Sequence, residues 1–103
     1  MDRIARLKEL LHTQPDDSFL QHALALEHIK AGDDTAARAL FEAVLERDPA
    51  YVGSYYHLAK LLERQGEEAG AIATYEKGMA AAKAAGDNHA YSELRSAHEE
   101  LTM

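Results

Sequence analysis

Cysteine is absent from the 103-residue sequence, and valine and isoleucine are few. Without cysteine the chain has neither a disulfide nor a thiolate ligand for a metal ion. No apolar run approaches the roughly 18–20 residues that span a bilayer, so we expect no membrane segment. The first 17 residues, MDRIARLKELLHTQPDD, carry scattered charges and no continuous apolar stretch. That pattern is unlike a secretory signal, and we expect a cytoplasmic location.

Positive charge is also scarce. The sequence contains 11 lysine and arginine residues and 18 aspartate and glutamate residues, which gives a net charge of −7. Nucleic acids and anionic membranes attract clustered lysine and arginine side chains. We therefore expect neither nucleic acid nor a membrane as a partner.

The residues that are abundant favour helix. Alanine, leucine, glutamate and arginine are frequent, and all four have high helix propensity. No stretch alternates polar and apolar residues over the length of a strand, so no sheet is expected. Aspartates suited to N-caps, together with the stop signals Gly32 and Gly66, divide the chain into helices. The predicted helices are approximately 2–13, 19–31, 34–48, 53–65, 67–86 and 88–101.

The sequence repeats itself with a period of 34 residues. The stretch GDDTAARALFEAVLERDPAY begins at Gly32, and GEEAGAIATYEKGMAAAKAA begins at Gly66. The same offset relates Leu24-Ala25 to Leu58-Ala59, Ala37 to Ala71, Phe41 to Tyr75 and Leu7 to Phe41. The chain therefore divides into a half-repeat (1–17), two repeats (18–51 and 52–85) and a final helix (86–103).

These residues resemble a tetratricopeptide repeat (TPR), whose pattern is W-x2-L-G-x2-Y, then A-x3-F, then P. The second repeat supplies Tyr55-x2-Leu58-Ala59 and then Ala71-x3-Tyr75. In the first repeat, Gln21 and His28 depart from the pattern at its aromatic positions. The resemblance implies one all-α domain over 1–103, a solenoid of helical hairpins. The polar outer face of residues 86–103 fits the capping helix that such solenoids need.

Six histidines raise the question of a metal or catalytic site. No HExxH motif occurs, no two histidines are spaced i,i+4, and a zinc site needs three or four ligands. We expect no catalytic residues, no metal site and no cofactor, and hence no enzyme. A histidine-based metal-dependent enzyme is kept only as a remote alternative.

The TPR resemblance implies that the first helix of each hairpin lines a concave groove that binds an extended peptide. We therefore expect a non-catalytic scaffold for protein–protein interaction, whose partner is a protein or peptide. Lysine and arginine at the groove predict an acidic segment with apolar anchors. The predicted groove residues are Phe19, His22, Leu26, Ile29, Lys30, Tyr56, His57, Lys60 and Arg64.

Two further expectations concern partners. One TPR subset grips the C-terminal carboxylate of heat-shock chaperones through lysines, asparagines and an arginine. None of these is found at the matching positions, which hold His22, Leu26, His57, Asp87 and Tyr91. The alternative to a peptide groove is a self-associating module, because Phe19, Leu26, Ile29 and Tyr56 are expected to expose apolar area that a homodimer would cover.

One glycine does not fit the repeat. Gly78 stands where the other copies have Leu10 and Val44. Glycine within a helix costs about 1 kcal/mol relative to alanine. We consider two explanations, the close approach of a bulky neighbour such as Tyr91 and drift tolerated by a stable helix.

Overall fold

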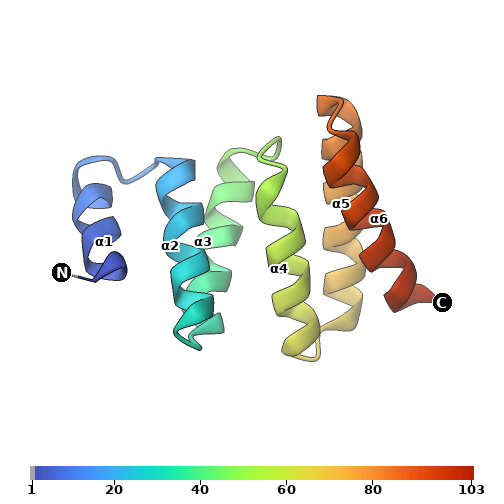
Figure 1. Ribbon diagram of the computed structural model, residues 1–103, viewed down its shortest axis with the longest axis horizontal. Helices are drawn as coiled ribbons and strands as arrows, with labels where there is room; N and C mark the ends of the chain where they lie inside the picture. The colour runs from blue at the N-terminus through green and yellow to red at the C-terminus, as the bar shows by residue number, and fades with distance from the viewer. Residues whose placement is uncertain (1) are drawn as a thin grey trace. The chain divides into compact units, whose positions relative to one another are not determined.

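The computed structural model describes residues 2–103, and the fold is all-α (Figure 1). Its helices are α1 (Arg3–Thr13), α2 (Ser18–Lys30), α3 (Asp34–Arg47), α4 (Gly53–Arg64), α5 (Glu68–Ala85) and α6 (Asn88–Thr102). Residues 2–103 contain no strand. The predicted fold class and the six predicted helices are thus confirmed, with end points that differ by a few residues at most.

Aspartate side chains begin four of the helices. Asp2, Asp17, Asp33 and Asp87 each accept a hydrogen bond from the backbone amide three residues later, at 2.8–3.1 Å. These bonds satisfy amides that have no partner within the helix, and the negative charge is favourable at a helix N-terminus. Gly32 and Gly66 follow α2 and α4 with φ of 81° and 77°. Glycine adopts this left-handed conformation without a Cβ clash, so each of these helices can stop and turn into the next.

Contacts along the chain separate two compact units, one ending at Asp48 and the other beginning at Pro49. In the first unit, α2 packs against both α1 and α3. Its buried core consists of Leu7, Leu24, Ala25, Ala37, Phe41 and Val44. The predicted division into one domain with a half-repeat, two repeats and a cap stays a prediction.

In the second unit, α5 packs against α4 and α6, and α6 also touches α4 (Figure 1). Ala59 and Ala71 are fully buried, as are Ala25 and Ala37 in the first unit. Small side chains at these positions allow two helices to approach closely, which explains why the repeat conserves alanine between its two copies. Tyr75 fills the space that Phe41 fills in the first unit, and both rings are fully buried.

Helix α6 has one buried face, as the sequence predicts. Leu94 and Ala97 are buried. The polar residues predicted for the outer face are all exposed: Ser92, Glu93, Arg95, Ser96, Glu99 and Glu100. An outer face of this kind fits the capping role expected of α6, and that role stays a prediction.

Gly78 is buried in α5, and a close neighbour is the correct explanation for it. A Cβ on Gly78 would lie 2.6 Å from Tyr55 Cβ and 3.1 Å from Leu94 Cδ2. The side chains closest to Gly78 are therefore Tyr55 of α4 and Leu94 of α6. The suggestion of Tyr91 as the nearest neighbour was wrong.

Candidate functional site

The predicted groove residues of the first unit lie on α2, and they are less open than expected. Phe19 is exposed to 68%. His22, Leu26 and Ile29 are half-buried, and only Lys30 joins Phe19 as an exposed side chain. Because α2 is packed between α1 and α3, most of its surface is covered. The expected broad apolar stripe is therefore not exposed: of its residues, only Phe19 presents an exposed side chain.

Two interactions order the α2 face. The His22 ring packs edge-on against Phe41, with ring centroids 5.6 Å apart. Near the end of the helix, Glu27 Oε2 lies 3.2 Å from both Lys30 Nζ and Arg3 Nε. The hydrogen bond from Lys30 lowers the pKa of Glu27 below its usual value, and the charge of Arg3 acts in the same direction. The Glu27 carboxylate is therefore shared by two cations, Lys30 of α2 and Arg3 of α1.

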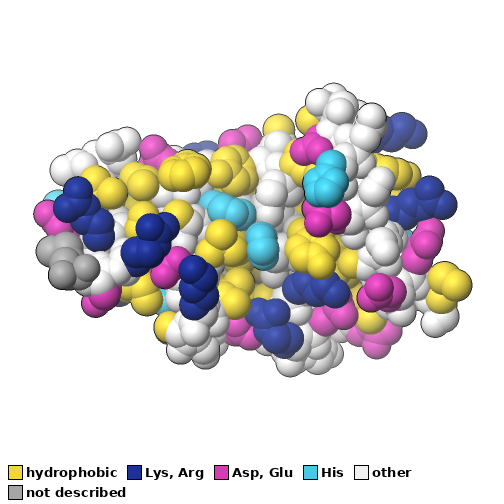
Figure 2. Space-filling view, viewed as in Figure 1, with side chains coloured by type: hydrophobic (Ala, Val, Ile, Leu, Met, Phe, Trp, Pro, Cys, Tyr) yellow, Lys and Arg dark blue, Asp and Glu magenta, His cyan; other side chains and the backbone are white. Residues whose placement is uncertain are grey.

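The predicted residues of the second unit lie on α4. Tyr56, His57 and Lys60 are half-buried, and Arg64 is exposed in the last turn. On the face drawn in Figure 2, histidine and hydrophobic side chains lie over α2 and over α4. The basic side chains of these two helices lie toward their C-terminal ends, Lys30 on α2 and Lys60 and Arg64 on α4. Within each unit, the first helix of the hairpin therefore carries histidine, hydrophobic and basic side chains, and the role of these residues as a binding groove stays a prediction.

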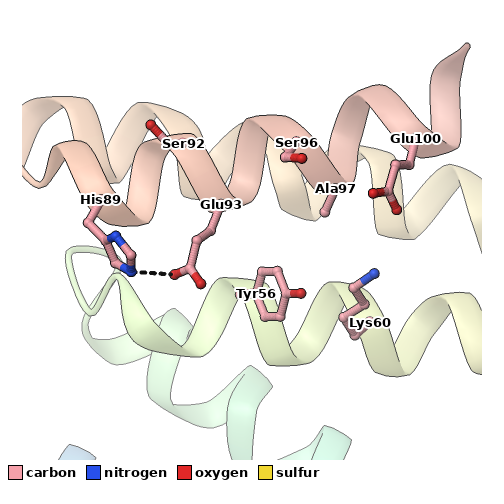
Figure 3. Close-up of a pocket in the computed structure, with 8 residues that line it drawn as sticks. All are labelled: Tyr56, Lys60, His89, Ser92, Glu93, Ser96, Ala97 and Glu100. Atoms are coloured by element: carbon pink, nitrogen blue, oxygen red, sulfur yellow. Dashed lines mark ion pairs between the residues drawn. The ribbon is translucent and has the colours of Figure 1, made fainter.

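A pocket of about 360 Å³ lies between α4 and α6 (Figure 3). Helix α4 contributes Tyr56 and Lys60. Helix α6 contributes His89, Ser92, Glu93, Ser96, Ala97 and Glu100. Two of the nine predicted groove residues thus line a real concavity, together with a polar face of α6.

Lys60 is held on the α4 side of this pocket. Its Nζ lies 3.8 Å from Glu63 Oε2 and 5.7 Å from the centroid of the Tyr56 ring. The buried Tyr75 donates a hydrogen bond from its hydroxyl to the same Glu63 oxygen. Burial and this bond raise the pKa of Tyr75 well above its ordinary value. Tyr75 therefore keeps its proton and orients the Glu63 carboxylate, with which Lys60 pairs.

The α6 side of the pocket is acidic. Glu93 Oε1 lies 3.5 Å from His89 Nε2, and the Glu93 side chain is 57% exposed. Glu100 stands two turns further along the same helix and is also exposed. The prediction of the groove omitted these two glutamates, because it assigned the polar face of α6 only the role of a solvated cap. Their i,i+7 spacing, which places both on one face of a helix, was the signal that could have identified them.

His57 differs from the other histidines in its surroundings. Burial lowers the pKa of its imidazole, the charge of Glu93 raises it, and the charge of Arg64 lowers it. The net shift is downward, so His57 is uncharged near neutral pH. Among residues 2–103 no group of three or more histidine, aspartate or glutamate side chains could hold a metal ion.

Comparisons with known proteins agree with the helical hairpins just described. The tetratricopeptide repeat family matches residues 28–97. The chain belongs to the TPR family. It is 31% identical to TPR repeat-containing protein PA0015 of Pseudomonas aeruginosa over 91 residues, which cover 88% of this chain and 87% of that protein.

Several solved structures resemble this one, and two of them are TPR domains that illustrate the likeness. A tetratricopeptide repeat domain protein from Salinibacter ruber is 45% identical, with a TM-score of 0.81 over 84% of this chain and 88% of that one. The TPR2B domain of yeast Sti1, solved in a complex with pHsp70, has a TM-score of 0.88 over 96% of this chain and 79% of that one. At 18% identity, this second likeness concerns the fold alone. No described helix is long and apolar enough to cross a membrane.

Proposed function

We propose that this TPR protein is a non-catalytic scaffold that binds a protein or peptide segment on the first helices of its hairpins. TPR proteins are typically interaction modules, and a fold alone does not specify a partner. The observation that carries the proposal is the α4–α6 pocket, which Tyr56 and Lys60 of a first helix line. A cytoplasmic location, expected from the sequence, stays a prediction.

The proposed partner segment carries apolar anchors and acidic groups. Phe19 offers an exposed aromatic side chain, and Leu26, Ile29 and Tyr56 are partly open. Lys30 has a side chain that is 73% exposed, so an acidic group can reach it, and Arg64 is exposed as well. Surface charge of one sign raises the encounter rate of a ligand of the other sign. The pHsp70 complex of the Sti1 domain shows that this fold can hold a protein ligand, although the carboxylate-clamp residues have no counterpart here.

Site-directed crosslinking tests this proposal. A photoreactive amino acid is placed at Phe19 or Arg64 on the first helices, or at Glu46 or Lys77 on the second helices, all of which are exposed. We expect the same protein to be crosslinked from both first-helix positions and from neither second-helix position. A pattern that is the same at all four positions, or that favours the second helices, contradicts the proposal.

Self-association is the second candidate function. The observation that supports it is the exposure of Phe19, which at 68% is large for an aromatic side chain. A second copy of the chain would then be the partner that covers it. The same crosslinking experiment separates the two candidates, because a homodimer yields a product of twice the mass of the chain from the purified protein alone.

A further inference from the structure

The α4–α6 pocket has the features of a cation site. The Tyr56 ring projects from α4 into the space between the helices, and Glu93 and Glu100 extend from α6 on either side of it (Figure 3). The face of an aromatic ring attracts a cation, and a nearby carboxylate strengthens that attraction. Ring and carboxylates come from two different helices that pack within one unit, so the fold itself brings them together.

The protein already places one of its own cations against this ring. Lys60 Nζ lies 5.7 Å from the Tyr56 centroid. Its charge is matched by Glu63 at 3.8 Å, which Tyr75 holds in place. Glu93 lies 3.5 Å from the imidazole of His89, and its charge also acts on the imidazole of His57. Glu100 has no ion pair with any described residue, so the carboxylates of α6 leave the pocket with net negative charge.

We propose that the α4–α6 pocket binds a basic side chain, arginine or lysine, of the partner segment. The cation would lie against Tyr56, between Glu93 and Glu100, and would compete there with Lys60. This inference rests on the proposed function and specifies one subsite of it. An acidic side chain fits poorly at this position, since Lys60, the lysine that lines the pocket, is already paired with Glu63.

The test uses two capped tripeptides, acetyl-Ala-Arg-Ala-amide and acetyl-Ala-Glu-Ala-amide, titrated into the ¹⁵N-labelled full chain. We expect the arginine peptide, and not the glutamate peptide, to shift amide signals of α4 and α6 around Tyr56 and Ala97. Replacing both carboxylates, as in Glu93→Gln/Glu100→Gln, should weaken arginine binding about three- to tenfold, the effect of two partly exposed ion pairs. Lys60→Met removes the internal competitor and should strengthen it by about twofold or more.

A matched control keeps the change in net charge and moves it away from the pocket. Glu46→Gln/Glu68→Gln alters two exposed glutamates that do not line the pocket. Because salt screens distant charges, this variant should bind the arginine peptide within about twofold of the wild type. Circular dichroism of each variant verifies that the helices are intact.

Three results of the peptide titrations would overturn the inference: equal shifts with the glutamate peptide, unchanged affinity in the Glu93/Glu100 variant, or weaker arginine binding in Lys60→Met. The proposed function is judged separately by crosslinking from Phe19 and Arg64, neither of which lines the pocket. A captured partner whose affinity is unaffected by the Glu93/Glu100 change would refute the basic subsite and leave the scaffold function standing. Arginine binding without any captured partner would support the basic subsite and leave the scaffold function without support.

Discussion

Gly78 and Tyr55 approach so closely that a Cβ on the glycine would lie 2.6 Å from the tyrosine Cβ. Atoms that are not bonded do not tolerate this separation. The glycine therefore lets α5 approach α4 at the position where the other copies of the repeat carry leucine or valine. Tyr55 is buried there and donates a hydrogen bond from its hydroxyl to the Pro49 carbonyl at 2.6 Å. The close packing of these two helices depends on the missing side chain.

The first prediction follows from this contact. Gly78→Ala should lower the free energy of unfolding by about 1–3 kcal/mol, because the added methyl group forces Tyr55 or the helix backbone to move. Gly70→Ala is the matched control in the same helix. Its Cβ would meet nothing closer than 3.8 Å, so higher helix propensity should raise stability by about 0.5–1 kcal/mol. Urea denaturation of both variants measures the difference, and equal effects would refute the packing argument.

The sequence predicted the fold well because its signals are local and repeated. Asp33 and Gly32 define a helix boundary within two residues, and the 34-residue period repeats such boundaries along the chain. The partner of Gly78 was harder to predict. A helix position has neighbours on two other helices, and only packing in three dimensions decides whether Tyr55, Leu94 or Tyr91 comes closest.

The second prediction concerns α6, the predicted capping helix. Leu94 is 1% exposed and packs beside Gly78, so Leu94→Ala should cost about 2–5 kcal/mol through lost burial and the cavity that remains. Ser92→Ala changes an exposed residue two positions earlier and should alter stability by no more than about 0.5 kcal/mol. Thermal unfolding followed by circular dichroism compares the two. A Leu94→Ala protein that melts like the wild type would show that α6 contributes little as a cap.

The third prediction uses the raised pKa of Tyr75. A group whose pKa is higher in the folded state keeps its proton longer there. It therefore adds stability that is fully present below its unfolded pKa of about 10 and is lost as the pH rises further. The unfolding free energy of the wild type should thus fall above pH 10, by up to about 1.4 kcal/mol per pH unit from this group.

Tyr75→Phe is the variant that tests this pH dependence. At neutral pH it should be about 1–3 kcal/mol less stable, because Glu63 loses a buried donor. Above pH 10 it should lose less additional stability than the wild type does. Denaturant titrations at pH 7, 10 and 11 supply the comparison, and parallel curves for the two proteins would contradict the assignment.

The candidate site was only partly predictable, and the reason is electrostatic. Counting charged residues on first helices predicted Lys30, Lys60 and Arg64 as groove cations opposed only by Glu63, but it overlooked Glu27, which lies 3.2 Å from Lys30. Such pairs three residues apart on one helix are readable in principle. The contribution of Glu93 and Glu100 depends on how α6 packs against α4, which no local pattern specifies.

The last prediction concerns self-association through Phe19. This residue stands in the first turn of α2 with 68% of its surface exposed, and Asp17 caps the helix independently of its side chain. Phe19→Ser should therefore change the free energy of unfolding by no more than about 0.5 kcal/mol. If Phe19 anchors a homodimer, the same change should weaken dimerisation at least about tenfold, because an aromatic anchor typically contributes 2 kcal/mol or more to an interface. Sedimentation equilibrium of both proteins over a range of concentrations measures this, and a wild-type chain that is monomeric at millimolar concentration would exclude the homodimer.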